Sequence, residues 1–124
     1  MRYLLDSNIL IALALDTNDG VITRAAACDA DDLVTSVIAY AEVAYGSVRG
    51  KRPSFAGLET LIEEVIVLPF DYAAGRAYAT LPLKRASYDR LIAAHALSLG
   101  LTVVTDNEKH FADVPKLKVE NWTL

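Results

Sequence analysis

Residues 3–15 read YLLDSNILIALAL, and this stretch decides the fold. The short apolar run 2–5 ends abruptly at the polar residues 6–8, and the apolar stretch 9–15 has a length typical of a helix. The pattern predicts a buried first strand, a polar turn and then a helix.

The same alternation of short strands and longer helices continues along the chain. Further strands are expected at 33–35, 65–68 and 101–105, and further helices at 21–28, 37–48, 54–64, 72–81 and 88–99. Ser36 and Asp71 stand where helix N-caps are expected, and Gly100 stands where the helix 88–99 should stop. Strands that alternate with helices predict a three-layer α/β/α sandwich with a central, mostly parallel sheet.

Length and composition favour a single globular domain over residues 1–124. Hydrophobic residues make up 53% of the chain and charged residues 23%, enough apolar material for a core and too little charge for disorder. The single cysteine excludes an internal disulfide and a cysteine-rich zinc site. The chain has no apolar run of membrane-spanning length, and an acid at position 6 argues against a signal peptide, so we expect a cytoplasmic protein without a membrane partner.

Two acids follow predicted strands. Asp6 comes after the first strand and Asp106 comes after the strand 101–105. In an open parallel sheet the ligand crevice lies at the carboxyl ends of the strands, so two acids separated by a hundred residues can meet there.

Two more acids lie on helices close to apolar faces. Glu42 shares a helix face with Ile38 and Tyr45, and Asp89 lies in the first turn of the helix 88–99. Each acid also has an ordinary interpretation: Asp6 as a turn residue, Glu42 as a solvated helix residue, Asp89 as a partner of the helix dipole, and Asp106 as a loop acid. His95 does not share the face of Asp89, and we expect it to pack rather than to catalyse.

Convergence of the four acids would require a cation. Two carboxylates about 4 Å apart repel by roughly 4 kcal/mol at an effective dielectric of 20. Oxygen ligands without thiolates favour Mg²⁺, with Mn²⁺ as a substitute, and such ions activate water to cleave phosphodiesters. We found no Ser-His-Asp, Cys-His or glycine-rich phosphate motif that would compete with this interpretation.

Four ordered segments resemble a known family, the VapC toxins and the similar FitB proteins. These segments are residues 4–8 (LLDSN), 41–46 (AEVAYG), 89–96 (DRLIAAHA) and 104–111 (VTDNEKHF). The resemblance extends from Tyr3 to Trp122 and includes residues 68–71 (LPFD) and 119–122 (VENW).

The resemblance implies a PIN domain that uses clustered acids and Mg²⁺ or Mn²⁺ to cut RNA. It assigns the catalytic positions to Asp6, Glu42, Asp89 and Asp106, of which Asp6, Asp89 and Asp106 would bind the metal. Asn107 is the alternative to Asp106, because relatives often place the fourth residue two positions after the threonine. Ser7 resembles a residue that orients a carboxylate or a water, although a simple helix cap is the other interpretation.

The net charge of −4 has the wrong sign for binding nucleic acid by bulk charge, so local basic residues would have to contact RNA. Arg85 and Arg90, with Lys84, flank the Asp89 motif and are the candidate RNA-binding residues. A second basic group, Arg49, Lys51 and Arg52, follows the Glu42 helix. Solvated surface charge is the alternative for each of these residues.

The resemblance also implies partners. An RNA-cutting enzyme needs an inhibitor, which in VapBC pairs is the antitoxin, so we expect a VapB-like antitoxin that inserts Arg or Lys among the carboxylates. Apolar helix faces, including that of residues 9–15, are candidates for the antitoxin contact and for a homodimer contact.

Two other functions fit the same elements less well. A receiver-like phosphoacceptor domain would need paired acids after the first strand and a lysine near the last strand, but the turn Asp6-Ser7-Asn8 has a single acid and the lysine is missing. A non-catalytic PIN-like binding module would keep the fold and lose the acids, which this chain retains.

Overall fold

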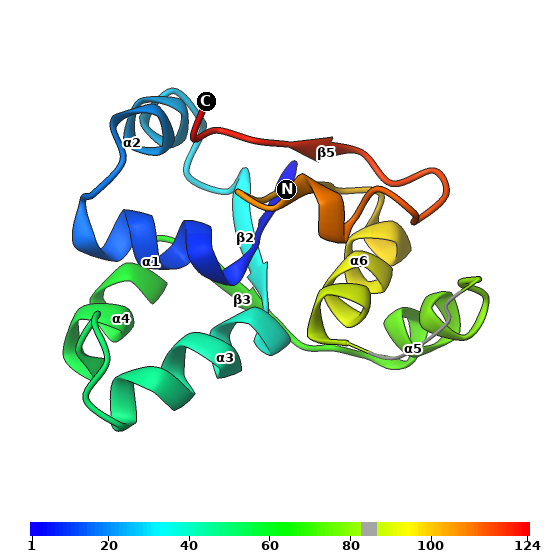
Figure 1. The fold of residues 1–124 in the computed structure, drawn as a ribbon, viewed down its shortest axis with the longest axis horizontal. Helices are drawn as coiled ribbons and strands as arrows, with labels where there is room; N and C mark the ends of the chain where they lie inside the picture. Colours follow the sequence, from blue (N-terminus) through cyan, green and yellow to red (C-terminus); the bar gives the residue numbers. More distant parts are fainter. Residues whose placement is uncertain (83–86) are drawn as a thin grey trace.

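The computed structural model describes residues 1–82 and 87–124, which form a parallel sheet with helices around it (Figure 1). The strands are β1 (Tyr3–Leu5), β2 (Leu33–Ser36), β3 (Ile66–Leu68), β4 (Thr102–Val104) and β5 (Val119–Glu120). They are ordered β3-β2-β1-β4-β5, and each of the four pairings is parallel. The predicted parallel sheet is therefore confirmed, with β1 at its centre.

Helices lie on both sides of this sheet. They are α1 (Ser7–Leu15), α2 (Asp19–Ala26), α3 (Val37–Val48), α4 (Phe55–Ile62), α5 (Tyr72–Ala79) and α6 (Tyr88–Leu99), with a short 3₁₀ helix η1 (Glu108–His110). In Figure 1, α1, α2 and α4 lie to one side of the strands, and α5 and α6 lie to the other. The arrangement confirms the predicted α/β/α sandwich.

Local signals explain where several elements begin and end. The Ser36 side chain accepts a hydrogen bond from the N–H of Ile38, and the Asp71 side chain accepts one from Ala74, so both predicted N-caps are confirmed. Gly100 ends α6 with φ of +68°, a left-handed conformation that glycine adopts without strain. The bounds predicted for α3 and α6 match those observed.

The first helix begins earlier than the sequence pattern predicts. It starts at Ser7 rather than at Ile9, because the Asp6 side chain accepts a hydrogen bond from the N–H of Ser7 and acts as the N-cap. Polar residues at 7 and 8 had suggested a turn. They are instead the first residues of α1, which therefore begins directly at the end of β1.

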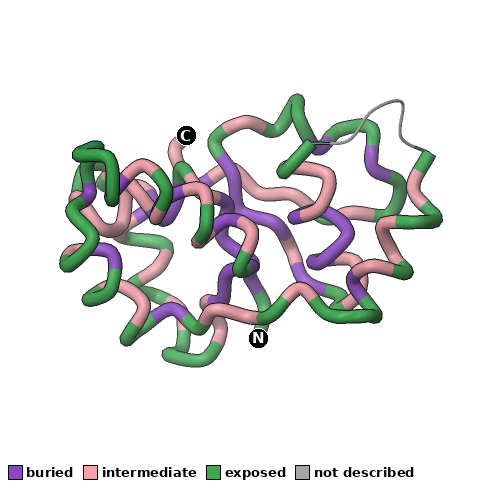
Figure 2. Tube along the Cα trace, turned by 90° about the horizontal axis from the view of Figure 1, so that it is seen from below, coloured by how far each residue is buried: buried purple, intermediate pink, exposed green. Residues whose placement is uncertain are grey.

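The central strands carry the core. Leu4, Leu5, Val34, Val103 and Val104 are fully buried, and the buried segments run through the middle of the molecule (Figure 2). A buried parallel strand has apolar residues on both faces, which explains the uninterrupted apolar runs in the sequence.

The C-terminal segment closes the core beside β1. Trp122 is buried and meets Tyr3 edge to face, with the ring centroids 5.0 Å apart. A Cβ atom on Gly20 would collide with the Trp122 carbonyl oxygen, so α2 approaches this segment through its glycine. Across the described residues, we find no helix both long enough and apolar enough to cross a lipid bilayer.

Candidate active site

The ends of the two central strands meet at one edge of the sheet. β1 and β4 are parallel neighbours, with Leu5 beside Val104. The next residue in each chain segment is polar, Asp6 after β1 and Thr105 after β4, and the N–H of Asp6 donates to the Val104 carbonyl at 2.9 Å. The register therefore places a carboxylate directly beside a hydroxyl at the edge where the strand-end argument expects a site.

Asp6 is held rigidly in a buried position. Its Oδ1 accepts from the N–H of Ser7 and its Oδ2 accepts from the Thr105 hydroxyl, both at 2.8 Å. Burial raises the pKa of Asp6, and the nearby charges of Asp89 and Asp106 raise it further, whereas the two hydrogen bonds oppose this shift. The carboxylate is thus oriented and partly destabilised in its charged form.

The two candidates for the fourth position point in different directions. Asp106 is exposed, and its Oδ1 accepts from the Nδ2 of Asn8 at 3.1 Å on the Asp6 side of the edge. The Asn107 side chain instead lies 3.1 Å from the Nδ1 of His110. The structure therefore places both residues at this edge, with the carboxylate of Asp106 facing α1.

Ser7 is the first residue of α1 and does not cap it, because Asp6 does. The helix-cap interpretation of Ser7 is therefore wrong. Ser7 lines a groove beside Glu42, and its role in orienting a carboxylate or a water stays a prediction.

Asp89 reaches the same edge from α6. It is half-buried, and its Oδ2 lies 2.7 Å from the Nδ1 of His110, which follows β4 in η1. Since a carboxylate only accepts, the ring nitrogen of His110 is the donor in this contact. The partners of Asp89 and Asp6, His110 and Thr105, thus both come from the segment that follows β4.

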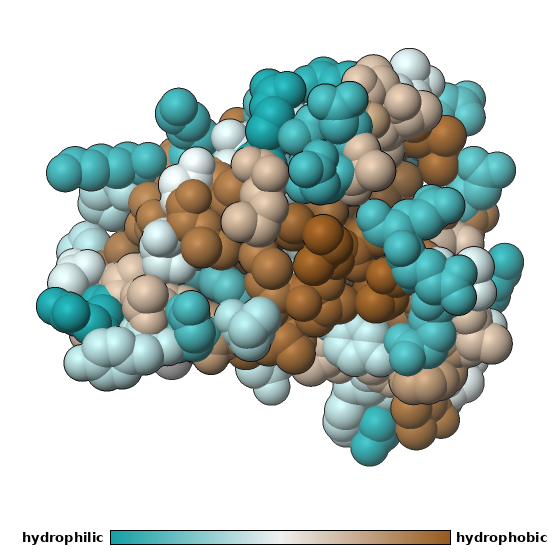
Figure 3. Space-filling model, turned by 180° about the vertical axis from the view of Figure 1, so that it is seen from behind, coloured by the Kyte–Doolittle hydropathy of each residue, from teal (hydrophilic) through white to brown (hydrophobic). Residues whose placement is uncertain are grey.

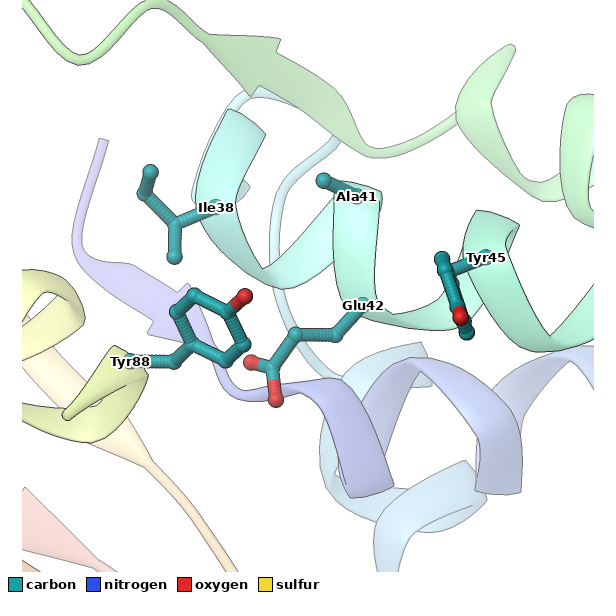
Figure 4. A pocket seen from close by; sticks show the side chains of 5 residues that line it. All are labelled: Ile38, Ala41, Glu42, Tyr45 and Tyr88. Atoms are coloured by element: carbon teal, nitrogen blue, oxygen red, sulfur yellow. The ribbon is translucent and has the colours of Figure 1, made fainter.

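Glu42 reaches the edge from α3 and has no comparable partner. Its Oε1 is buried, and among the described residues it has no hydrogen-bond partner. The carboxylate lies beside the ring of Tyr88, and Tyr45 lies farther along α3 (Figure 4). Burial, followed by the charges of Asp6 and Asp89, raises the pKa of Glu42 to about 7.

The four acids therefore influence one another electrostatically. Asp6 feels the charges of Asp89 and Asp106, and Glu42 feels those of Asp6 and Asp89. Within residues 1–82 and 87–124, however, no three acid, histidine or cysteine side chains are gathered closely enough to hold a metal ion as they stand.

Of the two candidate RNA-binding arginines, only Arg90 lies among the described residues. Arg90 pairs with Asp113 at 2.7 Å, its side chain is only 17% exposed, and its Nη1 is buried without a hydrogen-bond partner among the described residues. Arg90 is therefore largely enclosed rather than extended into solvent. Arg85 and Lys84 lie outside the described residues.

The sequence argument missed two residues of the site, Thr105 and His110. Thr105 had a usable signal, because it follows β4 as Asp6 follows β1. The acid one position later, Asp106, is the stronger signal for a metal ligand. His110 gave no local signal, since only folding shows that η1 reaches Asp89. His95, by contrast, packs as predicted: it is buried, its Nδ1 lies 2.8 Å from the Ser36 hydroxyl, and burial lowers its pKa.

Comparisons with known proteins identify the family of the chain. Residues 3–117 match the PIN domain family. The chain is 34% identical to ribonuclease VapC1 of Haemophilus influenzae strain R2866, with 99% of each chain covered. It is 30% identical to the tRNA(fMet)-specific endonuclease VapC of Salmonella typhimurium, with 98% of each chain covered.

A solved structure has the same fold over nearly the whole chain. It is the crystal structure of VapBC2 from Rickettsia felis bound to a DNA fragment from their promoter, with a TM-score of 0.87 and 26% sequence identity. The match covers 98% of this chain and 99% of the matched chain. The receiver alternative is thereby set aside, and the chain belongs to the PIN domain family, among its VapC members.

Proposed function

We propose that this protein is a metal-dependent endoribonuclease, the toxin of a toxin–antitoxin pair, that hydrolyses RNA phosphodiester bonds. The observation that carries the proposal is the meeting of four acids from four separate segments at one edge of the sheet. The relatives named ribonuclease and endonuclease VapC support the same activity.

The residues present fit a divalent cation. The buried, unpartnered Oε1 of Glu42 and the mutual repulsion of the carboxylates both call for positive charge at this edge. Asp6, Asp89 and Asp106 would hold the ion, and their hard oxygen donors suit Mg²⁺, with Mn²⁺ as a substitute. When bound, such an ion supplies an activated water and stabilises charge on the leaving oxygen.

The chain's own residues prepare this reaction. The hydrogen bonds from Thr105 and Ser7 hold the Asp6 carboxylate in one orientation. Glu42, with its pKa raised to about 7, can take a proton from the attacking water at Oε1 near neutral pH. His110 contacts the Asp89 carboxylate from the segment that follows β4.

The direct test is cleavage of purified RNA. We expect the wild-type protein to cleave in Mg²⁺ or Mn²⁺ and to lose this activity in EDTA, because no side chain at the edge is placed to attack a phosphodiester unaided. Total tRNA is the first substrate to test, since one relative is named for tRNA(fMet), and mixed-sequence single-stranded RNA is the second. The metal mechanism would be excluded if the wild-type protein cleaved RNA undiminished in EDTA while Asp6→Asn, purified in the same way, was inactive.

The partner we propose is a VapB-like antitoxin. The VapBC2 structure supports this, as does the complementarity between an acidic edge and Arg or Lys side chains. An apolar patch rimmed by polar side chains covers the face opposite to that of Figure 1, and such a patch suits an antitoxin segment or a second copy in a homodimer (Figure 3).

Toxicity separates the toxin from a nuclease of another role. We expect expression of the wild-type protein alone to stop growth, and Asp6→Asn to relieve this without preventing antitoxin binding. If soluble wild-type protein is expressed without slowing growth, the toxin assignment is wrong. The cleavage assay then decides separately whether the protein is a ribonuclease.

A further inference from the structure

Two large aromatic side chains beside the candidate active site are exposed. Tyr45 is 64% exposed near the end of α3, and Tyr88 is 63% exposed at the start of α6. Together with Ile38, Ala41 and Glu42 they line a hollow of about 420 Å³. The volume lies within the range of pockets that bind small organic groups, roughly 300–1,000 Å³.

The walls of the hollow are flat and mostly apolar. The Tyr88 ring lies beside Ile38 and the Glu42 carboxylate, and Tyr45 lies farther along α3 on the same side (Figure 4). Ile38, Ala41 and Tyr45 follow one another at helical spacing, so they form one stripe of α3. The small side chain of Ala41 leaves room between the two rings.

A cationic groove continues from this hollow. It has a volume of about 230 Å³ and shares Glu42 and Tyr45 with the hollow, and Lys51 and Arg52 line it. Both cations are exposed, and within the described part of the chain neither forms an ion pair. The Arg49 guanidinium lies 3.5 Å from the centre of the Tyr45 ring, which adds a third cation beside the aromatic wall.

This combination matches a single RNA strand. A nucleotide presents a flat base to an aromatic ring and a negative phosphate to a cation, and single-stranded RNA is recognised by both. An apolar protein segment would use the hollow but would gain nothing from three adjacent cations. In a protein of net charge −4, two exposed cations in a groove that also holds Glu42 would attract a phosphate to this part of the acidic edge.

We propose that the hollow is a nucleobase subsite next to the cleaved phosphodiester, a proposal that rests on the ribonuclease function. One unpaired base stacks on Tyr88, and the neighbouring phosphates lie along Lys51 and Arg52. The subsite requires the target RNA to be single-stranded at this position, because a paired base cannot reach a ring in a hollow.

The first test separates stacking from folding. Tyr88→Leu removes the ring and keeps an apolar side chain, and Tyr88→Phe keeps the ring. Tyr72→Leu is the matched control, because Tyr72 is also exposed and also begins a helix, α5, but lines neither hollow nor groove. On single-stranded RNA with Mg²⁺ we expect Tyr88→Leu to raise KM about 5- to 100-fold with little change in kcat, and the other two variants to behave as wild type.

The second test observes the base directly. Single-stranded RNA containing 2-aminopurine loses fluorescence when that base stacks on a ring, and an Asp6→Asn background keeps the RNA uncut. We expect the fluorescence to fall when this RNA binds Asp6→Asn, to fall equally with Asp6→Asn/Tyr88→Phe, and to remain unchanged at saturating Asp6→Asn/Tyr88→Leu.

The outcomes separate this inference from the function on which it rests. If wild type cleaves RNA but Tyr88→Leu has the wild-type KM and the same fluorescence loss, the subsite is wrong and the ribonuclease stands. If Tyr88→Leu leaves KM unchanged but dissociates an oligomer in light scattering, the hollow is a protein contact, which also overturns the subsite. If wild type cleaves no RNA, both the function and the subsite fall.

Discussion

Two carboxylates at the candidate active site are each held by one side chain from the segment that follows β4. Asp6 accepts from Thr105 at 2.8 Å, and Asp89 lies 2.7 Å from His110. The distances are nearly equal, but the surroundings differ. Asp6 is 4% exposed and Thr105 is fully buried, whereas the side chains of Asp89 and His110 are 26% and 57% exposed.

The difference shows that burial, rather than length, decides what such a bond contributes. Breaking a buried bond leaves a polar group without water, which costs about 1–3 kcal/mol, whereas an exposed charged pair contributes about 0–1 kcal/mol. Asp6 is therefore fixed by its surroundings, whereas Asp89 is freer to change its position. One rigid and one adjustable carboxylate would suit the divalent cation proposed above, because the described side chains do not form a closed ligand set as they stand.

The largest effect is expected from removing the rigid charge itself. Asp6→Asn should lower the rate of RNA cleavage more than about 100-fold, because a ligand of the proposed metal is lost. The metal-free variant should be at least as stable as wild type at pH 7, since burial penalises the charged carboxylate. Cleavage rates and thermal denaturation of the same preparations check both points. Cleavage within tenfold of wild type would contradict the assignment.

The next effect is expected from loosening the rigid carboxylate without removing it. Thr105→Val keeps the shape but loses the hydroxyl that donates to Asp6 and accepts from the N–H of Asn107. We expect activity to fall about 10- to 100-fold, the range typical of residues that orient metal ligands. Thr102→Val, in β4 three residues earlier and without a side-chain hydrogen bond among the described residues, is the control and should retain activity. Equal activity of the two variants would show that Asp6 needs no orientation.

Glu42 tests the opposite extreme, a carboxylate whose buried Oε1 has no hydrogen-bond partner in residues 1–82 and 87–124. Its pKa is raised from 4.5 to about 7 in the folded protein, so the folded state binds the proton more tightly than the unfolded state. Its contribution to stability is therefore full below pH 4.5 and is lost as the pH rises to about 7, by on the order of 2 kcal/mol after solvent screening. Glu42→Gln should remove this loss, so that in EDTA the variant gains stability over wild type as the pH rises. Urea denaturation of wild type and Glu42→Gln in EDTA at pH 5 and pH 8 measures this gain. If the difference in the free energy of unfolding between the two proteins were the same at both pH values, the burial argument would be refuted.

The smallest effect is expected at the exposed pair. His110→Ala removes the partner of Asp89, and we expect activity to fall no more than about fivefold at low salt, because the pair is exposed to solvent. The difference from wild type should shrink further in 0.5 M salt, which screens exposed charges. A loss as large as that of Thr105→Val would mean that Asp89 is as dependent on its partner as Asp6 is.

Much of the fold was predictable because its signals are local. The bounds of α3 and α6 follow from apolar spacing together with Ser36 and Gly100, which act within a few residues of themselves. The start of α1 was misjudged because the capping role of Asp6 competes with its appearance as a turn residue. Asp6 fits both a helix N-cap and a turn residue, and the sequence alone does not show which of the two applies.

The sequence by itself determined the order of the first four strands and of the six α-helices and the placing of Asp6 and Asp106 after strands, because periodicity and capping depend on neighbours in the chain. Only the tertiary structure decided which side chains meet those acids. The pairing of Leu5 with Val104 brings Thr105 to Asp6, and the path of η1 brings His110 to Asp89. Sheet register and loop path join residues about 20 to 100 positions apart, and their energies come from packing the whole core, so no local pattern encodes them.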